Sequence, residues 1–274
     1  MSSSLDAESL SAWNVIAPYW DDTIGKDGNK YWRLLQEPSL SRLLGPNLAK
    51  PGCRALDLAT GNGLCARWLA GRGAKVYATD GSEVMVGIAK GRSEGCGIEF
   101  GVLDVTSKEG WEGFLEGEGR EPFDIVLMNM AIMDVGDIEP LAAALPKLLQ
   151  KGGTFVATIL HPVFFTSNAA KSITIDFDPE TGEQRVVRSK VITEYMSVAP
   201  AKGVAHIGQP KKQICWHRPI GELYTTFFKA GLVLDGMEEL AFTEADGNEE
   251  RVDSSANYTQ LPALLAFRLR ISSA

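Results

Sequence analysis

Residues 54–70 read "RALDLATGNGLCARWLA": an apolar, strand-like run that contains one acid, then a glycine break, then a helix-like run. Gly61 and Gly63 allow the backbone to approach a ligand, and the start of the helix supplies free N–H groups. The spacing from Gly61 to Ala66 also fits a dinucleotide-binding pattern, which is a weak signal alone. Asp57 lies four residues before Gly61. It would add nothing to a pyrophosphate site, but a ligand with a cationic amine would gain a charge-assisted hydrogen bond. We therefore expect the carboxylate and the glycines to hold one ligand.

Short apolar runs alternate with amphipathic, helix-like runs between residues 51 and 160. This alternation is typical of βαβ units and predicts a mainly parallel sheet. Two further apolar runs, 232–242 and 262–271, are separated by loop-like residues and could pair antiparallel. The expected fold is α/β: a doubly wound, mostly parallel seven-stranded sheet with an antiparallel last strand and helices on both faces. The five earlier strands are expected at 54–59, 75–80, 98–104, 123–130 and 153–160.

Composition narrows the range of partners. The 274-residue chain carries a formal net charge of −8, so it lacks the global positive field that attracts nucleic acid. No apolar stretch approaches the roughly 18–20 residues that span a bilayer. The polar, acidic N-terminus lacks the features of a secretory signal, so we expect a cytoplasmic protein with no membrane partner. The four cysteines form no CxxC pair and do not stand beside a histidine at zinc spacing, so no metal site is expected.

The run "DLATGNG", residues 57–63, resembles the first motif of class I S-adenosylmethionine-dependent methyltransferases. In that family the loop, here with Ala59, Gly61 and Gly63, holds the methionine part of the cofactor. The resemblance implies that Asp57 fixes the cofactor's amino group, directly or through water. Asp80 ends the next predicted strand, 23 residues after Asp57. It matches the family's second-strand acid, which binds both ribose hydroxyls, and Gly81 follows it.

Three more landmarks follow in the family's order. Met85, just inside the helix after Asp80, matches an apolar contact to the adenine. Asp104 and Val105 end the third predicted strand, where the family contacts the adenine amino group and ring. Asn129 and Met130 follow the fourth strand and are implied to lie under the sulfonium. The resemblance therefore implies S-adenosyl-L-methionine as the cofactor.

The remaining segments are interpreted around this core. Residues 1–50 are expected to form an N-terminal helical lid, and 51–160 the cofactor-binding, Rossmann-like core. Residues 161–217 break the rhythm and contain a hairpin pattern, 172–192, with its turn at "DPETGE". They are interpreted as an insertion that covers the substrate. Residues 218–274 are expected to complete the core sheet.

The segment "WNVIAPYWDDTIGKDGNKYWRLL", residues 13–35, resembles the lid helix of small-molecule methyltransferases. The resemblance implies that Trp20 closes over the cofactor and that Asn29 and Tyr31 contact the substrate. The alternative is an aromatic helix that packs on the sheet. Met133 and Tyr195 are expected to line the acceptor pocket.

Two histidines are candidate catalytic bases. His161 follows the fifth predicted strand, and the carboxyl ends of strands in open α/β sheets face the ligand crevice. His217 precedes a predicted helix near the end of the insertion. Either histidine could instead have a structural role, His161 by satisfying a backbone group and His217 by stabilising the helix start. His206 is expected at the surface.

These observations favour a methyltransferase that acts on a small-molecule acceptor, with O-methylation favoured over N- or S-methylation. We expect a monomer or homodimer and no nucleic-acid partner, although methylation of tRNA or protein stays open. One alternative is a nicotinamide-dependent oxidoreductase that uses the glycine pattern, which would leave Asp57 unexplained. Another is a non-catalytic partner subunit with the methyltransferase fold.

Overall fold

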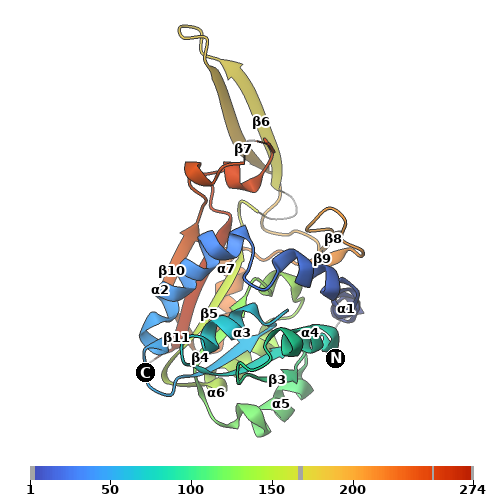
Figure 1. The fold of residues 1–274 in the computed structure, drawn as a ribbon, viewed down its shortest axis with the longest axis vertical. Coiled ribbons are helices and arrows are strands. Elements are labelled where there is room, and N and C mark those ends of the chain that lie inside the picture. Colours follow the sequence, from blue (N-terminus) through green and yellow to red (C-terminus); the bar gives the residue numbers. More distant parts are fainter. Residues whose placement is uncertain (1–3, 166–168, 249, 273–274) are drawn as a thin grey trace.

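A seven-stranded sheet forms the centre of the computed structural model, which describes residues 4–165, 169–248 and 250–272 (Figure 1). Its strand order is β10-β11-β5-β4-β1-β2-β3. β11 pairs antiparallel with both β5 and β10, and the other pairings are parallel. The predicted fold class is confirmed. The strands are β1 (Arg54–Leu58), β2 (Lys75–Asp80), β3 (Glu99–Val102), β4 (Phe123–Asn129), β5 (Leu149–Leu160), β10 (Leu232–Leu240) and β11 (Leu264–Ile271).

Helices cover both faces of this sheet, as a largely parallel sheet requires. One apolar core contains Trp111, Leu145 and Phe227 from the helices of one face. A second core contains Leu40, Leu69 and Trp32 from the other face. The helices are α1 (Ser4–Ile24), α2 (Glu37–Leu48), α3 (Leu64–Ala70), α4 (Glu83–Arg92), α5 (Lys108–Glu116), α6 (Glu139–Leu148) and α7 (Ile220–Lys229), with a π-helical turn η1 (Trp32–Gln36) and 3₁₀ turns η2 (Glu118–Arg120), η3 (Ile132–Asp134), η4 (Glu244–Asp246) and η5 (Ser255–Asn257).

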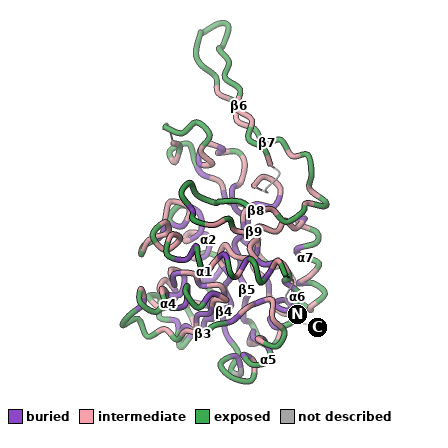
Figure 2. Tube along the Cα trace, turned by 90° about the vertical axis from the view of Figure 1, so that its right-hand side faces the viewer, coloured by how far each residue is buried: buried purple, intermediate pink, exposed green. Residues whose placement is uncertain are grey.

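A hairpin projects from the body of the protein (Figure 1). It consists of β6 (Ala169–Phe177) and β7 (Gln184–Ile192), which pair antiparallel with each other as a separate two-stranded sheet. The predicted hairpin and its turn are therefore confirmed. The green tube in Figure 2 shows that most of the hairpin is exposed. A second small sheet, β8 (Ala201–Gly203) and β9 (Gln213–Cys215), packs through β9 on α1.

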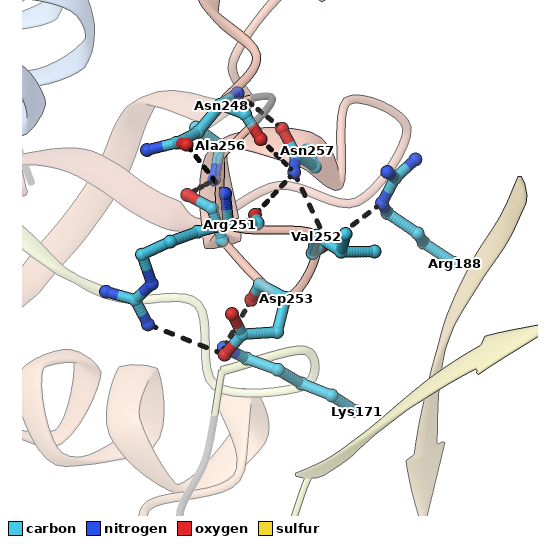
Figure 3. Close-up of polar contacts among 9 residues, drawn as sticks. Lys171, Arg188, Asn248, Arg251, Val252, Asp253, Ala256 and Asn257 are labelled. Atoms are coloured by element: carbon cyan, nitrogen blue, oxygen red, sulfur yellow. Dashed lines mark hydrogen bonds and ion pairs between the residues drawn. The ribbon is translucent and has the colours of Figure 1, made fainter.

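The loop between β10 and β11 supports the base of the hairpin (Figure 3). Lys171 of β6 donates from Nζ to the carbonyl oxygen of Asp253 at 2.7 Å. Arg188 of β7 donates from Nε to the carbonyl oxygen of Val252 at 3.2 Å. The Asn257 amide in turn donates to carbonyls of the same loop. Beyond this base, β6 and β7 form strand hydrogen bonds with each other and with no other strand that the structure describes. None of the helices described in the structure is long and apolar enough to cross a membrane.

Candidate functional site

A cavity of about 450 Å³ opens at the carboxyl ends of the central strands. This is where open α/β sheets bind their ligands, and the volume lies in the range of small-molecule sites. The loops after β1, β2, β3 and β4 form its floor. Residues of α1 and of the segment 205–213 form its opposite wall.

The two glycines of the loop after β1 have different surroundings. Gly61 lines the cavity with φ +57°, and a side chain there would meet nothing within 4 Å. Gly63, the residue before α3, has φ +79°. A Cβ at this position would lie 3.2 Å from the Cβ of Ala89 in α4. Gly63 is not among the residues that line the cavity. The cavity lining therefore does not support its expected direct contact with a ligand, and at Gly63 the loop packs closely on α4.

Asp57 is a buried carboxyl group at the edge of the cavity, with 1% of its surface exposed. The Thr60 hydroxyl donates to its Oδ2. Within the described residues, Asp57 takes part in no ion pair. Burial therefore raises its pKa to about 7, and the negative charge of Asp80 contributes to the rise. A cationic ligand group would supply the missing countercharge.

Asp80 anchors the glycine loop to the end of β2. Its Oδ2 accepts from the Gly61 N–H at 2.9 Å, and its Oδ1 accepts from the Ser82 N–H at 2.9 Å. Burial raises the pKa of this carboxyl group. Each carboxylate oxygen has further acceptor capacity. The side chain therefore has the capacity to accept from two ligand hydroxyls without giving up its contacts to the loop.

The other residues expected to hold the cofactor also line the cavity: Trp20, Ala59, Gly81, Met85, Asp104, Val105, Asn129 and Met130. The Asn129 amide is already occupied, because it donates to Gln36 at 2.9 Å and accepts from the Thr158 hydroxyl. Ala59 and Met130 have φ angles of +50° and +55°, and no other non-glycine residue in the described chain has a positive φ. Such strained backbone is concentrated at functional sites, and here it follows the two central strands.

The electrostatic character of the cavity is acidic. Among the residues that the structure describes, neither a lysine nor an arginine lines it. Five aspartates do: Asp6, Asp57, Asp80, Asp104 and Asp134. Their arrangement offers no metal site, since no three His, Cys, Asp or Glu side chains of the described chain could hold an ion together. This lining suits a cationic ligand and disfavours a pyrophosphate.

Helix α1 closes the cavity and is tied to the glycine loop. Asp21 forms an ion pair with Arg92 of α4 at 2.8 Å and accepts from the Asn62 amide at 3.0 Å. The ring of Trp20 lies 5.5 Å from that of His206, centroid to centroid, in an edge-to-face arrangement. The expected lid residues Asn29 and Tyr31 also line the cavity, as does Met133.

The two candidate bases do not reach this cavity. His161 is buried, and its Nε2 lies 2.9 Å from Glu239 Oε1 on β10, while its Nδ1 accepts from the Val163 N–H at 3.2 Å. Its backbone N–H donates to Ala263 and so continues the pairing toward β11. The side chain therefore points toward the β10 edge, away from β4 and β1, and the geometry does not support the assignment of His161 as base.

His217 and Tyr195 contact each other instead of the cavity. The Nε2 of His217 lies 2.6 Å from the Tyr195 carbonyl oxygen. The Tyr195 hydroxyl accepts from the Ile220 N–H at the start of α7, at 2.7 Å. His217 lines a separate cavity of only about 30 Å³. Neither residue lines the large cavity, so the assignments of His217 as base and Tyr195 as substrate contact are not supported.

Other cavity residues were missed by the sequence reasoning. His206 and Gln213 line the cavity from the insertion, where no readable pattern identified them. His206 is exposed, as expected, and it also lines the wall of the cavity. Asp134 had a usable signal, since it is an acid shortly after a strand that ends in the ligand crevice. The hairpin contributes no described residue to the cavity, so the insertion reaches it through residues 205–213 alone.

Comparisons with known proteins agree with this architecture. Residues 55–153 match the model of a family described as a methyltransferase domain. Over 117 residues, the chain is 36% identical to a ubiquinone biosynthesis O-methyltransferase of Rhizobium etli. That alignment covers 42% of this chain and 45% of the relative, so the chain spans less than half the length of that curated relative.

Two solved structures share the fold. One is an S-adenosylmethionine-dependent methyltransferase from Mesorhizobium loti, with a TM-score of 0.64, 24% identity, and coverage of 90% of this chain and 100% of that one. The other is DhpI in complex with SAH, with a TM-score of 0.55, 17% identity and full coverage of both chains. The domain match identifies residues 55–153 as a methyltransferase domain, and the chain as a whole shares its seven-stranded fold with S-adenosylmethionine-dependent methyltransferases.

Proposed function

We propose that this chain transfers a methyl group from S-adenosylmethionine to a hydroxyl group of a small-molecule acceptor. The observation that carries the proposal is the acidic cavity at the ends of consecutive strands, without a lining lysine or arginine in the described residues. S-adenosylmethionine carries positive charges at its sulfonium and its amino group and one negative charge at its carboxylate, so its net charge is positive. When bound, it supplies an activated methyl group.

The donor set of the cavity fits this cofactor. Asp57, a buried carboxyl without an ion-pair partner in the described chain, would hold the amino group. Asp80 has spare acceptor capacity on both oxygens and would hold the two ribose hydroxyls. Asp104 accepts from the N–H and hydroxyl of Thr106 through Oδ1, which leaves its second oxygen for the adenine amino group. Val105 and Met85 are buried apolar residues beside it and would contact the ring.

The choice of a hydroxyl acceptor rests on two supports. The matched Rhizobium etli relative is named as an O-methyltransferase. The cavity also contains a carboxyl group, Asp134, beyond those assigned to the cofactor. A hydroxyl acceptor needs such a proton acceptor within reach, whereas for a neutral amine the orientation that binding supplies is sufficient. The enclosing rings of Trp13 and Trp20 favour a small, largely apolar acceptor.

The alternative of a nicotinamide-dependent oxidoreductase has little support from the cavity. A pyrophosphate bound at the glycine loop would lie beside Asp57 and Asp80, and no cation of the described lining would offset their charge. A non-catalytic partner subunit has no specific support either, because the cavity retains each acid expected to hold the cofactor.

Calorimetric titration with S-adenosylmethionine, S-adenosylhomocysteine and NAD tests the proposal. We expect the first two to bind and NAD not to bind. Asp80→Asn should weaken both affinities by about 10- to 100-fold, because hydrogen bonds to a charged group contribute about 1.5–3 kcal/mol. The control is Asp176→Asn, a substitution on the exposed hairpin, which should leave both affinities unchanged. Binding of NAD alone would overturn the proposal. Incubation with a panel of phenols, with product detection by mass spectrometry, then tests the acceptor class.

A further inference from the structure

Asp134 occupies a distinct position in the cavity. It ends η3, the 3₁₀ turn that follows β4, and its side chain lines the cavity. The turn is held from both sides: the Trp216 N–H donates to the Met133 carbonyl at 2.7 Å, and the Ser9 hydroxyl of α1 donates to the Asp134 carbonyl at 3.3 Å. These two hydrogen bonds fix the backbone of the turn from which the Asp134 carboxyl group enters the cavity lining.

The contacts of Asp134 differ from those of the other cavity acids. Asp57, Asp80 and Asp104 each accept from a hydroxyl or a backbone N–H of the loop that follows their own strand. Asp6 accepts from the Gly136 N–H at 2.9 Å. The side-chain hydrogen bond of Asp134 comes from the neutral Gln213 amide, 3.2 Å from Oδ1. Its other oxygen has no hydrogen-bond donor in the described chain within bonding distance.

The charged groups around Asp134 do not neutralise it. Arg218 is the guanidinium behind η3, and it donates to the carbonyl oxygens of Ile132, Val135 and Gly136 rather than to a carboxylate. Asp6 from α1 and His206 from the insertion face the same cavity, and Cys215 of β9 lies nearby. Burial raises the pKa of Asp134 to about 8.

We propose that Asp134 is the catalytic base of this enzyme and that it recognises the hydroxyl group of the acceptor. The inference rests on the proposed methyltransferase function and adds the residue that removes the proton. Its free carboxylate oxygen accepts a hydrogen bond from the acceptor hydroxyl, while Gln213 holds the other oxygen. As the acceptor oxygen forms its bond to the methyl carbon, the O–H proton moves to Asp134. The methyl–sulfur bond breaks, and its electron pair stays on sulfur, which becomes a neutral thioether.

The raised pKa suits this role. A base is most effective when its pKa lies near the working pH, and an ordinary aspartate is too weak. Without a positive charge beside it, Asp134 keeps its proton to a higher pH than an ordinary aspartate does. A positive charge bound in the same cavity stabilises the carboxylate and releases that proton. The group is thus converted to its basic form when the methyl donor is in place.

The difference between two ligands isolates this effect. S-adenosylmethionine carries a positive sulfonium, whereas S-adenosylhomocysteine is neutral at sulfur, and the two share the amino group that Asp57 would contact. Proton release that depends on Asp57 is therefore common to both. Calorimetry at pH 7.5 in phosphate and in Tris buffer measures the protons released, because the two buffers have different ionisation enthalpies.

We expect S-adenosylmethionine to release more protons than S-adenosylhomocysteine from the wild-type protein. Asp134→Asn should abolish that difference while both ligands still bind. The control is Asp137→Asn, an exposed position three residues away that does not line the cavity, and it should preserve the difference. With a phenol that the wild-type protein methylates, Asp134→Asn should lower kcat by about 10²–10⁴-fold with little change in the KM of the methyl donor.

Two outcomes would overturn the role of Asp134 and leave the proposed function intact. One is a difference in proton release that persists in Asp134→Asn, and the other is a phenol that this variant methylates as fast as the wild-type protein does. If neither nucleoside binds to the wild-type protein, the proposed function fails, and the role of Asp134 fails with it.

Discussion

Asp57→Asn tests whether the buried carboxyl group of Asp57 lowers the free energy of unfolding in the absence of a ligand. Asp57 is a buried carboxyl group without an ion-pair partner in the described chain, and its pKa is raised from 3.8 to about 7, mainly by burial. Asparagine has nearly the same shape, and its carbonyl oxygen can still accept from the Thr60 hydroxyl. The carboxyl group also accepts from the Ala66 N–H, and a single amide oxygen cannot replace both carboxylate oxygens. That loss affects the variant at every pH, so the change with pH reports the ionisation of Asp57.

The size and sign of the effect follow from the two pKa values. Below pH 3.8 both the folded and the unfolded chain hold the proton, so the group does not affect stability. Between pH 3.8 and about 7 the unfolded chain has lost the proton that the folded protein retains, so the free energy of unfolding falls as pH rises. Above pH 7 the cost is complete, at about 4 kcal/mol from roughly 3 units at about 1.36 kcal/mol each.

Urea unfolding of both proteins at pH 5, 6, 7 and 8 measures this cost. We expect Asp57→Asn to be the more stable protein, with an advantage that grows by roughly 2–3 kcal/mol between pH 5 and pH 8. The same variant should bind S-adenosylmethionine much more weakly. Titrating groups that do not interact with Asp57 cancel in the difference, whereas Asp80 contributes to it because its charge and that of Asp57 repel each other. An advantage that stays constant across this pH range would refute the reasoning.

Two further predictions concern segments outside the cavity. His161→Ala should lower the free energy of unfolding by roughly 1–3 kcal/mol, because it leaves the Val163 N–H without its acceptor. The affinity for S-adenosylmethionine should be unchanged, and a loss of that affinity in calorimetry would return His161 to the site. Replacement of residues 174–187 by a short Gly-Ser linker, which retains Lys171 and Arg188, should leave folding and cofactor affinity intact, because in the described chain these parts of β6 and β7 pair as strands only with each other. Loss of cofactor binding by the folded variant would show that the hairpin is needed for the site.

The hydrophobic pattern was sufficient to predict the core of this protein. Seven apolar runs with alternating helical segments specify the sheet, because each run can bury both faces only between layers of helices. Asp57, Asp80 and Asp104 could be placed in one cavity for a related reason. Asp57 and Asp80 lie in the last two residues of parallel strands and Asp104 lies just after one, and the carboxyl ends of parallel strands meet at the same edge of the sheet.

The sequence could not predict where the side chains of residues beyond those strand ends point. His161 follows β5 just as Asp80 ends β2, yet pairing with β11 turns its ring toward Glu239 on β10. His206 and Gln213 reach the cavity only because the insertion folds back against α1. The environment of Asp134 likewise depends on residues far away in the sequence, Ser9 on α1 and Gln213 on β9. Periodicity encodes which face of an element is buried, but these positions depend on long-range packing, and that packing places the partly exposed Asp134 at the cavity wall.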